Sequence, residues 1–247
     1  MLMRLMTYNI KSGRYHADGL EAIARVLEAQ SPDIVGLQEV DEGTTRSGSV
    51  AQTDWLARRL RMNGVFASAI AFDGGSYGLA LLSRYPIQSH QKRLLFRPTY
   101  PDAAVRPRHD SEQRVVLTAS SGPLTITVSH LGLTPDQRAV QAQELYDTAC
   151  QSGEPMVIMG DFNCEPDAPE LAVLRARFQD ACAVCGVRGD DRFTFPSGLR
   201  GARCDDGWRG AIDHVWASRG VQIISARVVM DTSRASDHQP LLVECEV

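Results

Sequence analysis

Six short apolar segments, far apart along the chain, end in the same way. Each is followed directly by one or two side chains that suit a metal ion or a phosphate group. If the segments are β-strands, their ends can bring these polar groups together without burying any of them unpaired. A chance distribution would also scatter such groups over helix faces and loops. The six segment ends are Tyr8-Asn9, Gln38-Glu39, Ser129-His130, Gly160-Asp161-Phe162-Asn163, Ile212-Asp213-His214 and Ser236-Asp237-His238.

The segment that leads to Asp161 shows the pattern most clearly. Residues 155–159 are a proline and four apolar residues, which is typical of a short buried strand. Residues two apart in an extended chain point to the same face, so Asp161 and Asn163 can reach one target. A carboxylate beside an amide suits a hard cation or a phosphate-bound water. The motif alone is equally typical of a β-turn, because Gly, Asp, Asn and Pro all favour turns.

The beginning of the chain predicts a strand–helix–strand unit. Apolar spacing indicates a strand over residues 2–10, a helix over 18–27 with Asp18 as its N-cap, and a core strand over 34–40. The second strand would deliver Glu39 at its end.

The middle of the chain repeats this arrangement. A strand over residues 124–130 ends in His130, and Thr134 with the following proline predicts the start of a helix that runs to about Cys150. The strand before Asp161 comes next. The repetition suggests two related halves.

The other segments complete a single domain over residues 1–247. We expect the α+β class, with two mixed or antiparallel sheets packed face to face and helices outside. The remaining predicted elements are helices over 52–62 and 168–178, a hairpin of strands over 65–71 and 77–83, and strands over 86–96, 113–119, 193–195, 212–217, 221–230 and 241–247.

Composition and charge limit the classes of partner. The 247 residues are 43% hydrophobic and 23% charged, which is ordinary globular usage. The net charge of −4 provides no overall positive field that would draw the chain onto nucleic acid. No apolar run approaches the ~20 residues of a membrane helix, and residues 1–10 indicate a strand rather than a signal segment.

The cysteines favour a reduced protein. They show no regular spacing of the kind found in disulfide frameworks, so we expect a soluble, cytoplasmic protein. Cys182 and Cys185 are interpreted as incidental, because a structural zinc site needs a second ligand pair and Cys204 is the only nearby candidate. The six positions are Cys150, Cys164, Cys182, Cys185, Cys204 and Cys245.

The segment from Lys92 to Arg114 is basic. It holds six Lys or Arg against three Asp or Glu, with three prolines. Such a segment is either a solvated loop or a loop that faces phosphate, and the sequence leaves both open.

Taken together, the six motifs resemble those of the endonuclease/exonuclease/phosphatase superfamily. The resemblance covers essentially the whole chain, with the motifs in the family's order, and residues 77–87 are similar to a stretch common in bacterial members. It implies a four-layer α/β/β/α sandwich and phosphoester hydrolysis with a divalent cation, usually Mg²⁺, with Mn²⁺ as the alternative. The matching motifs are Thr7-Tyr8-Asn9-Ile10, Leu37-Gln38-Glu39-Val40, Ser129-His130-Leu131, Gly160-Asp161-Phe162-Asn163, Ile212-Asp213-His214 and Ser236-Asp237-His238-Gln239-Pro240.

The resemblance also implies a role for most of these residues. Glu39 would bind the metal directly, since Mg²⁺ takes one or two carboxylates and keeps its other positions for water and substrate. Asn9 would support the metal site or Asp161, and Asp237 would touch this metal or a second one. Asp161 and Asn163 would hold the attacking water and a phosphate oxygen.

Two histidines complete the implied catalytic set. Asp213 would orient His238, which would act as a general base or stabilise charge in the transition state. His130 would donate to a phosphate oxygen. Whether Asp161 or His238 takes the proton of the water is left open, as is the number of metal ions. Taken singly, Glu39 is more typical of a surface acid, Asn9 of a turn residue, and each histidine of a core or capping residue.

Three basic residues are weaker candidates for binding phosphate: Lys11, Arg46 and Arg114. A solvated side chain is an equal alternative for each of them. His214 follows Asp213 on a strand and should point the opposite way, so its role is structural. Family members often carry a basic residue where Ala211 lies, so binding of the leaving group would differ here.

The substrate preference follows from charge. A nuclease of duplex DNA needs a basic track several phosphates long, which the acidic balance does not favour. The leading hypothesis is therefore a Mg²⁺-dependent phosphodiesterase or phosphatase acting on a small or single phosphoester. The alternatives are a DNA or RNA nuclease, and a non-catalytic binding protein on the same scaffold.

Overall fold

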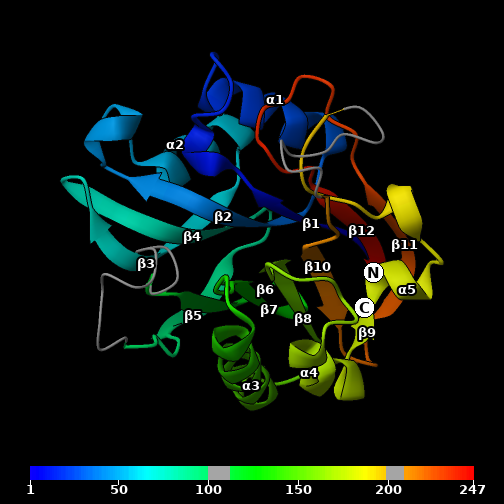
Figure 1. The fold of residues 1–247 in the computed structure, drawn as a ribbon. Coiled ribbons are helices and arrows are strands. Elements are labelled where there is room, and N and C mark those ends of the chain that lie inside the picture. Colours follow the sequence, from blue (N-terminus) through cyan, green and yellow to red (C-terminus); the bar gives the residue numbers. More distant parts are fainter. Residues whose placement is uncertain (100–111, 199–208) are drawn as a thin grey trace.

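The computed structural model describes residues 1–99, 112–198 and 209–247, and its strands form two six-stranded sheets (Figure 1). The first sheet has the order β11-β12-β1-β2-β4-β3, with β1 (Leu2–Asn9), β2 (Ile34–Glu42), β3 (Asn63–Phe72), β4 (Gly75–Ser83), β11 (Gln222–Val228) and β12 (Leu241–Glu246). The second has the order β5-β6-β7-β8-β10-β9, with β5 (Ile87–Leu94), β6 (Val115–Ser121), β7 (Leu124–His130), β8 (Met156–Asp161), β9 (Gln179–Asp180) and β10 (Asp213–Ala217).

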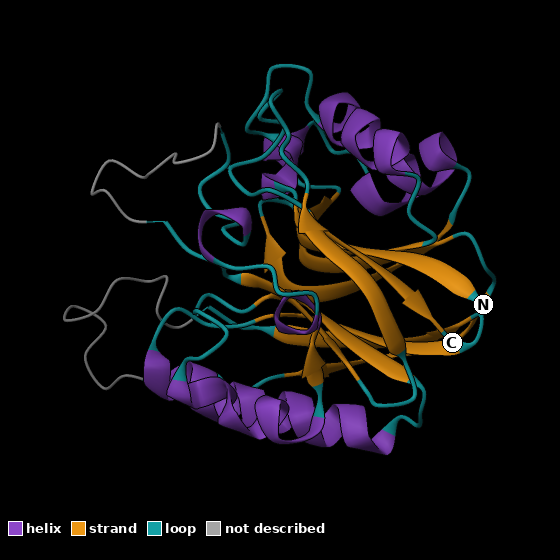
Figure 2. Cartoon of the chain, turned by 90° about the vertical axis from the view of Figure 1, so that its right-hand side faces the viewer, coloured by secondary structure: helices purple, strands orange, loops and turns teal. Residues whose placement is uncertain are grey.

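Helices cover the outer faces of the two sheets (Figure 2). On the first sheet, α1 (Leu20–Gln30) and α2 (Gln52–Leu60) bury Ile23, Leu27 and Leu56 against the strands. On the second, α3 (Pro135–Gln151) and α4 (Ala172–Arg177) pack Leu145 and Leu174 around Trp216 of β10. The short α5 (Ala181–Val184) contacts β10 and β11. The result is the predicted four-layer α/β/β/α sandwich.

The largest apolar cluster lies between the two sheets. Leu5 and Leu81 come from the first sheet, and Val128 and Met159 from the second. The sheets approach closely at Gly36, where a Cβ would lie 2.8 Å from the Met159 sulfur. A larger residue at this position would therefore push the layers apart.

The two predicted strand–helix–strand units are present, one in each sheet. In the described residues, β1 pairs in parallel with β2, and β7 with β8; every other strand pairing is antiparallel. At the ends of the parallel pairs, Asn9 lies opposite Gln38 and His130 opposite Asp161. Because the sheets pack face to face, both polar strand ends meet on one side of the sandwich.

Two local predictions were wrong. The N-cap of α1 is Gly19 without a side-chain hydrogen bond, because the carboxylate of Asp18 binds Arg25 instead. Residues 193–195 form no strand; in the described part of the chain they contribute an isolated bridge between Phe195 and Gly210. The other predicted strands and helices are present, with ends shifted by a few residues.

The cysteines in the described ranges are all free thiols. Cys182 packs in the core between the sheets, and burial raises its pKa to about 12. Within the same ranges, no helix has the length and apolar character needed to cross a membrane.

Candidate active site

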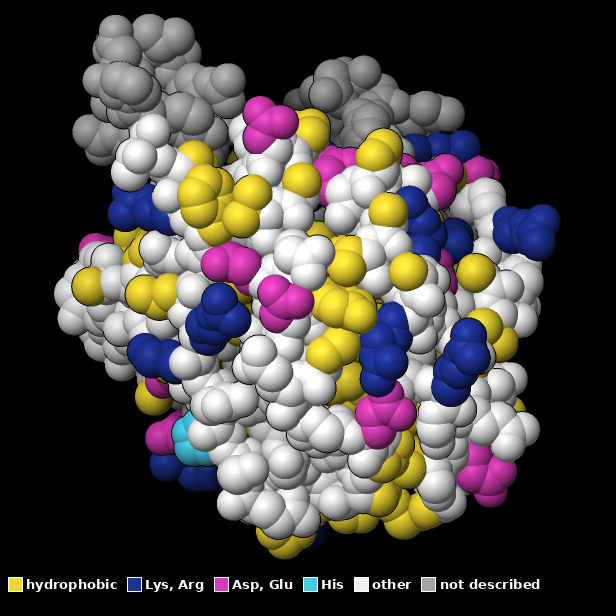
Figure 3. All heavy atoms as spheres, turned by 90° about the horizontal axis from the view of Figure 1, so that it is seen from below, with side chains coloured by type: hydrophobic (Ala, Val, Ile, Leu, Met, Phe, Trp, Pro, Cys, Tyr) yellow, Lys and Arg dark blue, Asp and Glu magenta, His cyan; other side chains and the backbone are white. Residues whose placement is uncertain are grey.

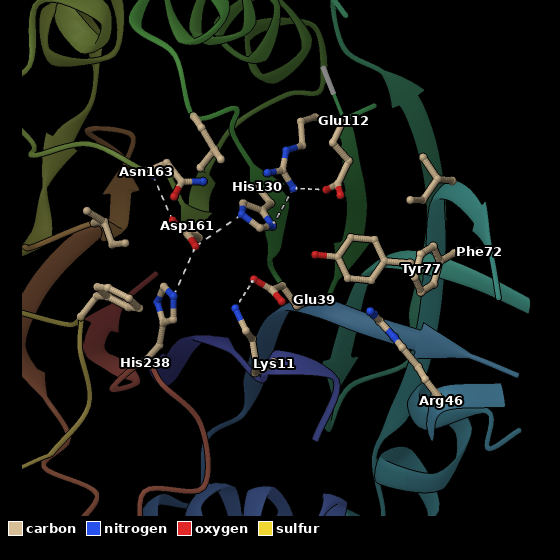
Figure 4. Close-up of a pocket in the computed structure, with 15 residues that line it drawn as sticks. Lys11, Glu39, Arg46, Phe72, Tyr77, Glu112, His130, Asp161, Asn163 and His238 are labelled. Atoms are coloured by element: carbon tan, nitrogen blue, oxygen red, sulfur yellow. Dashed lines mark hydrogen bonds and ion pairs between the residues drawn. The ribbon is translucent and has the colours of Figure 1, made fainter. Parts of the chain in front are cut away.

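A cavity of about 400 Å³ opens where the polar strand ends meet (Figure 4). Eight of the eleven predicted site residues line it: Lys11, Glu39, Arg46, Arg114, His130, Asp161, Asn163 and His238. The other three contact lining residues, since Asn9 binds Asp161, Asp213 binds His238 and Asp237 pairs with Lys11. The structure therefore brings all eleven to one region.

Asp161 lies at the centre of the buried part of the site. It is the last residue of β8 and 1% exposed, and it accepts hydrogen bonds from Asn9 Nδ2 at 3.0 Å and from the Asn163 backbone at 2.9 Å. The preceding Gly160 has φ +152°, and a Cβ there would lie 1.9 Å from the Ser129 carbonyl oxygen. The strand end therefore requires glycine beside its catalytic candidate.

His238 is held by Asp213, as predicted. Its Nδ1 lies 2.8 Å from Asp213 Oδ2, and its Nε2 lies 3.7 Å from Asp161 Oδ2. The ring of Phe195 packs against it with centroids 4.8 Å apart. Burial opposes protonation, but the carboxylates of Asp213 and Asp161 outweigh it and raise the pKa of His238 well above its usual range. The ring is therefore an imidazolium at neutral pH.

Burial has the opposite effect on the carboxylate that faces this ring. It raises the pKa of Asp161, an effect that the positive charge of His238 counteracts. Asp161 is therefore more basic than an ordinary aspartate.

His130 is neutral, and its tautomer follows from its neighbour. Arg114 Nη1 lies 3.2 Å from His130 Nδ1, and an arginine can only donate, so Nδ1 is the acceptor and Nε2 carries the proton. Burial, followed by the positive charge of Arg114, lowers the pKa of His130 well below its usual value. The Nε2–H lies 3.5 Å from Asp161 Oδ2 on the cavity side. His130 is thus a neutral hydrogen-bond donor.

Asn163 reaches the cavity through a turn. Its φ of +53° shows that the chain is not extended after Asp161, and its Nδ2 donates to the Leu131 carbonyl oxygen at 2.8 Å. The expectation that Asp161 and Asn163 share one face of an extended strand was therefore wrong. The motif is a turn, and it still directs both residues to the cavity.

Glu39 does not lie at the end of its strand, where it was predicted. It lies within β2 rather than at its end, at an irregularity between Leu37 and Val40 where the pairing with β4 shifts register. Its φ is +55°, and a bulge of this kind re-aims a side chain. The Ser12 hydroxyl donates to the Glu39 carbonyl oxygen at 3.1 Å, and Asn9 Nδ2 donates to its carboxylate at 3.1 Å. The side chain remains 17% exposed at the cavity.

Two groups of side chains could hold a metal ion. Asp161, Asp213 and His238 offer ligand atoms within 4.8 Å of one another. The Nδ1 of His238 is already bound to Asp213, however, and all three residues are buried.

The second group consists of Glu39 and Asp237, and it fits a hard cation better. Lys11 Nζ lies 3.7 Å from Glu39 Oε1 and 3.1 Å from Asp237 Oδ2, so the ammonium group of this lysine lies between two partly exposed carboxylates. Mg²⁺ prefers such oxygens. Asn9 directs its amide nitrogen, and not its oxygen, to Glu39 and Asp161, which suits the supporting role predicted for it.

Arg114 and Arg46 line the cavity, but each is paired with an acid. Arg114 Nη1 lies 2.7 Å from Glu112 Oε1. Arg46 binds Asp41 through Nε at 2.8 Å and Nη2 at 2.7 Å. Most of the basic segment that ends at Arg114 lies outside the described residues, namely 100–111.

Two aromatic residues of the cavity wall, Phe72 and Tyr77, had no predicted role in the site. The predicted hairpin carries both, but only its packing on the rest of the sheet shows that its tip borders the site. Thr194 was missed as well; its hydroxyl accepts from the Ile212 and Asp213 backbones at 3.2 and 3.1 Å. No periodicity in that loop indicated this role.

His214 points away from the cavity, as predicted. Its Nε2 lies 3.0 Å from the carbonyl oxygens of both Cys164 and Ala211, so Nε2 carries the proton. Burial lowers the pKa of His214 to about 4. It is therefore a neutral structural residue.

Comparisons with known proteins agree with the fold. Over the full chain, the structure superimposes on an endonuclease/exonuclease/phosphatase from Bacteroides vulgatus with a TM-score of 0.74, at 19% identity and 99% coverage of that protein. A mannosyl-6-phosphatase from Bacteroides thetaiotaomicron gives 0.73, at 16% identity, with 99% of this chain and 100% of that chain covered. The human Nocturnin catalytic domain with bound sulfate gives 0.67, at 20% identity, with 99% and 94% covered.

The sequence itself identifies the family. No curated protein matches the chain. The model of the Endonuclease/Exonuclease/phosphatase family, however, matches residues 6–238, which span all six polar strand ends. The chain therefore belongs to the endonuclease/exonuclease/phosphatase family, whose members hydrolyse phosphoester bonds.

Proposed function

We propose that this protein is a divalent-cation-dependent hydrolase that cleaves small phosphoesters by in-line attack of water. The observation that carries the proposal is the meeting of Asp161, His130, His238 and Glu39 in one cavity, with Asp237 beside it through Lys11. Water adds to phosphorus as the ester oxygen leaves, which yields an alcohol and a phosphate. Mg²⁺, or Mn²⁺ in its place, would be held by Glu39 and Asp237 and would neutralise charge on the phosphoryl oxygens.

The chain's own residues supply the proton chemistry. Asp161, made more basic by burial, orients the attacking water with Asn163 and accepts its proton. The imidazolium of His238 stabilises the developing negative charge, and the Nε2–H of His130 donates to a second phosphoryl oxygen. Lys11 and Arg114 add positive charge at the same end of the cavity.

The charge balance favours a small substrate over a nucleic acid. In the part of the chain that the structure describes, each Lys or Arg that lines the cavity lies within 4 Å of a carboxylate: Lys11, Arg46 and Arg114 pair with Asp237, Asp41 and Glu112. A nuclease gains most of its affinity from basic groups that are available to the phosphates. The similarity to a structure named as a mannosyl-6-phosphatase supports the same choice.

A substrate panel tests the proposal. A chromogenic phosphodiester, a hexose 6-phosphate, inositol phosphates, plasmid DNA and an abasic duplex are each incubated with Mg²⁺, with Mn²⁺ and with EDTA. We expect turnover of a small ester that EDTA abolishes. Rapid nicking of plasmid DNA without turnover of any small ester would instead assign the chain to the nucleases.

A further inference from the structure

The cavity has a second end that the proposed hydrolysis does not use. Figure 4 shows Arg46 and Phe72 on the side of the cavity opposite Asp161 and His238, and Tyr77 lies between these two sides. A volume of about 400 Å³ lies within the range of pockets that bury drug-sized ligands, so a phosphoryl group would fill only part of it. The organic part of a phosphoester would therefore extend toward Arg46.

Arg46 is fixed in place by buried partners. Its Nε and Nη2 bind the fully buried Asp41, and Nη2 also donates to the Ser12 hydroxyl at 3.0 Å. Its backbone N–H donates to Asp73 Oδ2 at 2.6 Å, which ties its turn to the tip of the β3–β4 hairpin. The guanidinium carbon lies 4.4 Å from the Phe72 ring centroid. A side chain held this firmly loses little entropy when it binds a ligand.

One part of this guanidinium is left for a ligand. Nε and Nη2 are engaged, whereas Nη1 has no hydrogen-bond partner among the described residues. The side chain is 26% exposed and lines the cavity. It therefore presents unused N–H donors at a defined position.

The charges at this end are balanced. Arg46 is neutralised by Asp41, while Arg114, which contacts His130 at the hydrolytic end, is paired with Glu112. Among the described residues, a second phosphate would meet no uncompensated positive charge here, and it would lie near the Glu112 carboxylate that also lines the cavity. This end therefore favours neutral hydrogen-bond acceptors over an anionic group.

The remaining walls at this end are apolar. Ile70 and Phe72 of β3 line the cavity, and Phe72 is 39% exposed. A ligand with a C–H face could cover these side chains while its hydroxyl groups reach Arg46 Nη1. Apolar walls with a few fixed polar groups are typical of small-molecule sites.

From these observations we infer that the far end is a subsite for an uncharged, polyhydroxylated leaving group, such as a sugar or polyol, with Arg46 as its specificity-determining residue. This inference rests on the proposed function, because it identifies the class of phosphoester that the same cavity takes. Such a subsite would favour monophosphorylated sugars as substrates over inositol polyphosphates and nucleic acids.

Binding of compounds that cannot be hydrolysed tests the subsite without turnover. Titration calorimetry with Mg²⁺ compares methylphosphonate with the 6-phosphonates of glucose, mannose and galactose. We expect at least one sugar phosphonate to bind about 10-fold more tightly than methylphosphonate. Arg46→Gln should remove about 10-fold of that advantage, which corresponds to ~1.4 kcal/mol, because the variant lacks the charged donor that a sugar hydroxyl would bind. Equal binding by all four compounds, or an unchanged advantage in the variant, would overturn the inference.

Two further variants control for folding and for loss of charge. Arg46→Gln leaves the buried Asp41 unpaired, so the double variant Asp41→Asn/Arg46→Gln is titrated as well and should lose the same advantage. Arg59→Gln removes an arginine that pairs with Glu21 and Glu28 on the outer helices, and it should bind every compound as the wild type does.

Kinetics separate the subsite from an effect on the metal. Arg46 contacts Ser12, which holds the Glu39 bulge, so a role through Glu39 would reduce kcat/KM equally for a hexose 6-phosphate and for 4-nitrophenyl phosphate. We expect a loss on the hexose ester alone, mainly in KM. An equal loss on both esters, or a preference of the wild type for inositol trisphosphate, would contradict the inference. If no phosphoester is hydrolysed, the proposed function fails, while the phosphonate titrations still decide the subsite.

Discussion

The two strand–helix–strand units, β1-α1-β2 and β7-α3-β8, have the same topology but end differently. In the second unit both strands stop at their polar residues, and His130 and Asp161 are paired in register and buried. In the first unit β2 continues past the site, and Glu39 leaves it through a bulge with its carboxylate partly exposed. One topology thus provides two electrostatic environments.

The difference suits two kinds of chemistry. A buried carboxylate surrounded by histidines has a shifted pKa and can exchange protons near neutral pH. A partly exposed carboxylate can bind a hydrated cation that keeps its own waters. We therefore expect changes in the buried unit to affect the proton chemistry and stability, and changes in the exposed unit to affect cation affinity.

The largest effect is expected in the buried unit, for Asp161→Asn. The variant keeps the shape of the side chain but cannot accept a proton, so kcat should fall by about 10²–10⁴-fold. Steady-state kinetics at saturating Mg²⁺ measure this, and circular dichroism confirms the fold. Recovery of the rate by added Mg²⁺ would show that Asp161 mainly serves the cation, and the contrast between the units would be lost.

The strand beside the buried unit should also respond to acid, through His214 of β10, which pairs with Gly160 of β8. Its folded pKa of about 4 lies below the usual value of 6.5, so the unfolded chain binds a proton that the folded chain excludes. The contribution of His214 to the free energy of unfolding is complete above pH 6.5 and falls as the pH drops toward 4, by up to ~3 kcal/mol. Urea titrations at pH 7 and pH 4.5 should show a smaller loss of stability in His214→Gln than in the wild type. An identical loss in both proteins would exclude His214 as a source of acid sensitivity.

In the exposed unit, Glu39→Gln should weaken the cation rather than the proton transfer. The Mg²⁺ concentration for half-maximal activity should rise by about 100-fold. Even mutation of residues that only hydrogen-bond to metal ligands lowers metal affinity by about 10–100-fold. The maximal rate at very high Mg²⁺ should recover in large part. Calorimetric titration of Mg²⁺ without substrate provides an independent measurement. Unchanged Mg²⁺ affinity would direct attention to the Asp161–Asp213–His238 group instead.

The smallest effect is expected for Ser12→Ala, which removes the hydroxyl that supports the Glu39 bulge. Mg²⁺ affinity should fall by about 10-fold and stability by ~1 kcal/mol. Thr125→Ala is the matched control, because its hydroxyl donates to the Ser152 carbonyl oxygen far from the site. Equal Mg²⁺ affinity in the two variants would show that the bulge holds its shape without Ser12.

Much of this architecture was predictable because its signals are local. Apolar runs and turn residues mark where strands begin and end, so the segments that deliver Asn9, His130, Asp161 and Asp213 could be located without coordinates. The errors arose where another contact competes with a local preference. Asp18 binds a helix side chain instead of capping its helix, and Glu39 lies in a bulge opposite β4.

The sequence by itself determined which residues end the strands, and hence which family the chain resembles, since alternation and turn chemistry depend on near neighbours. Only the tertiary structure decided the state of each group. His238 is protonated because Asp213 and Asp161 come from distant strands to face it. Arg46 lies at the cavity because its turn is tied to the tip of a hairpin. Distances between segments set electrostatic energies and cavity shape, and a linear pattern does not contain them.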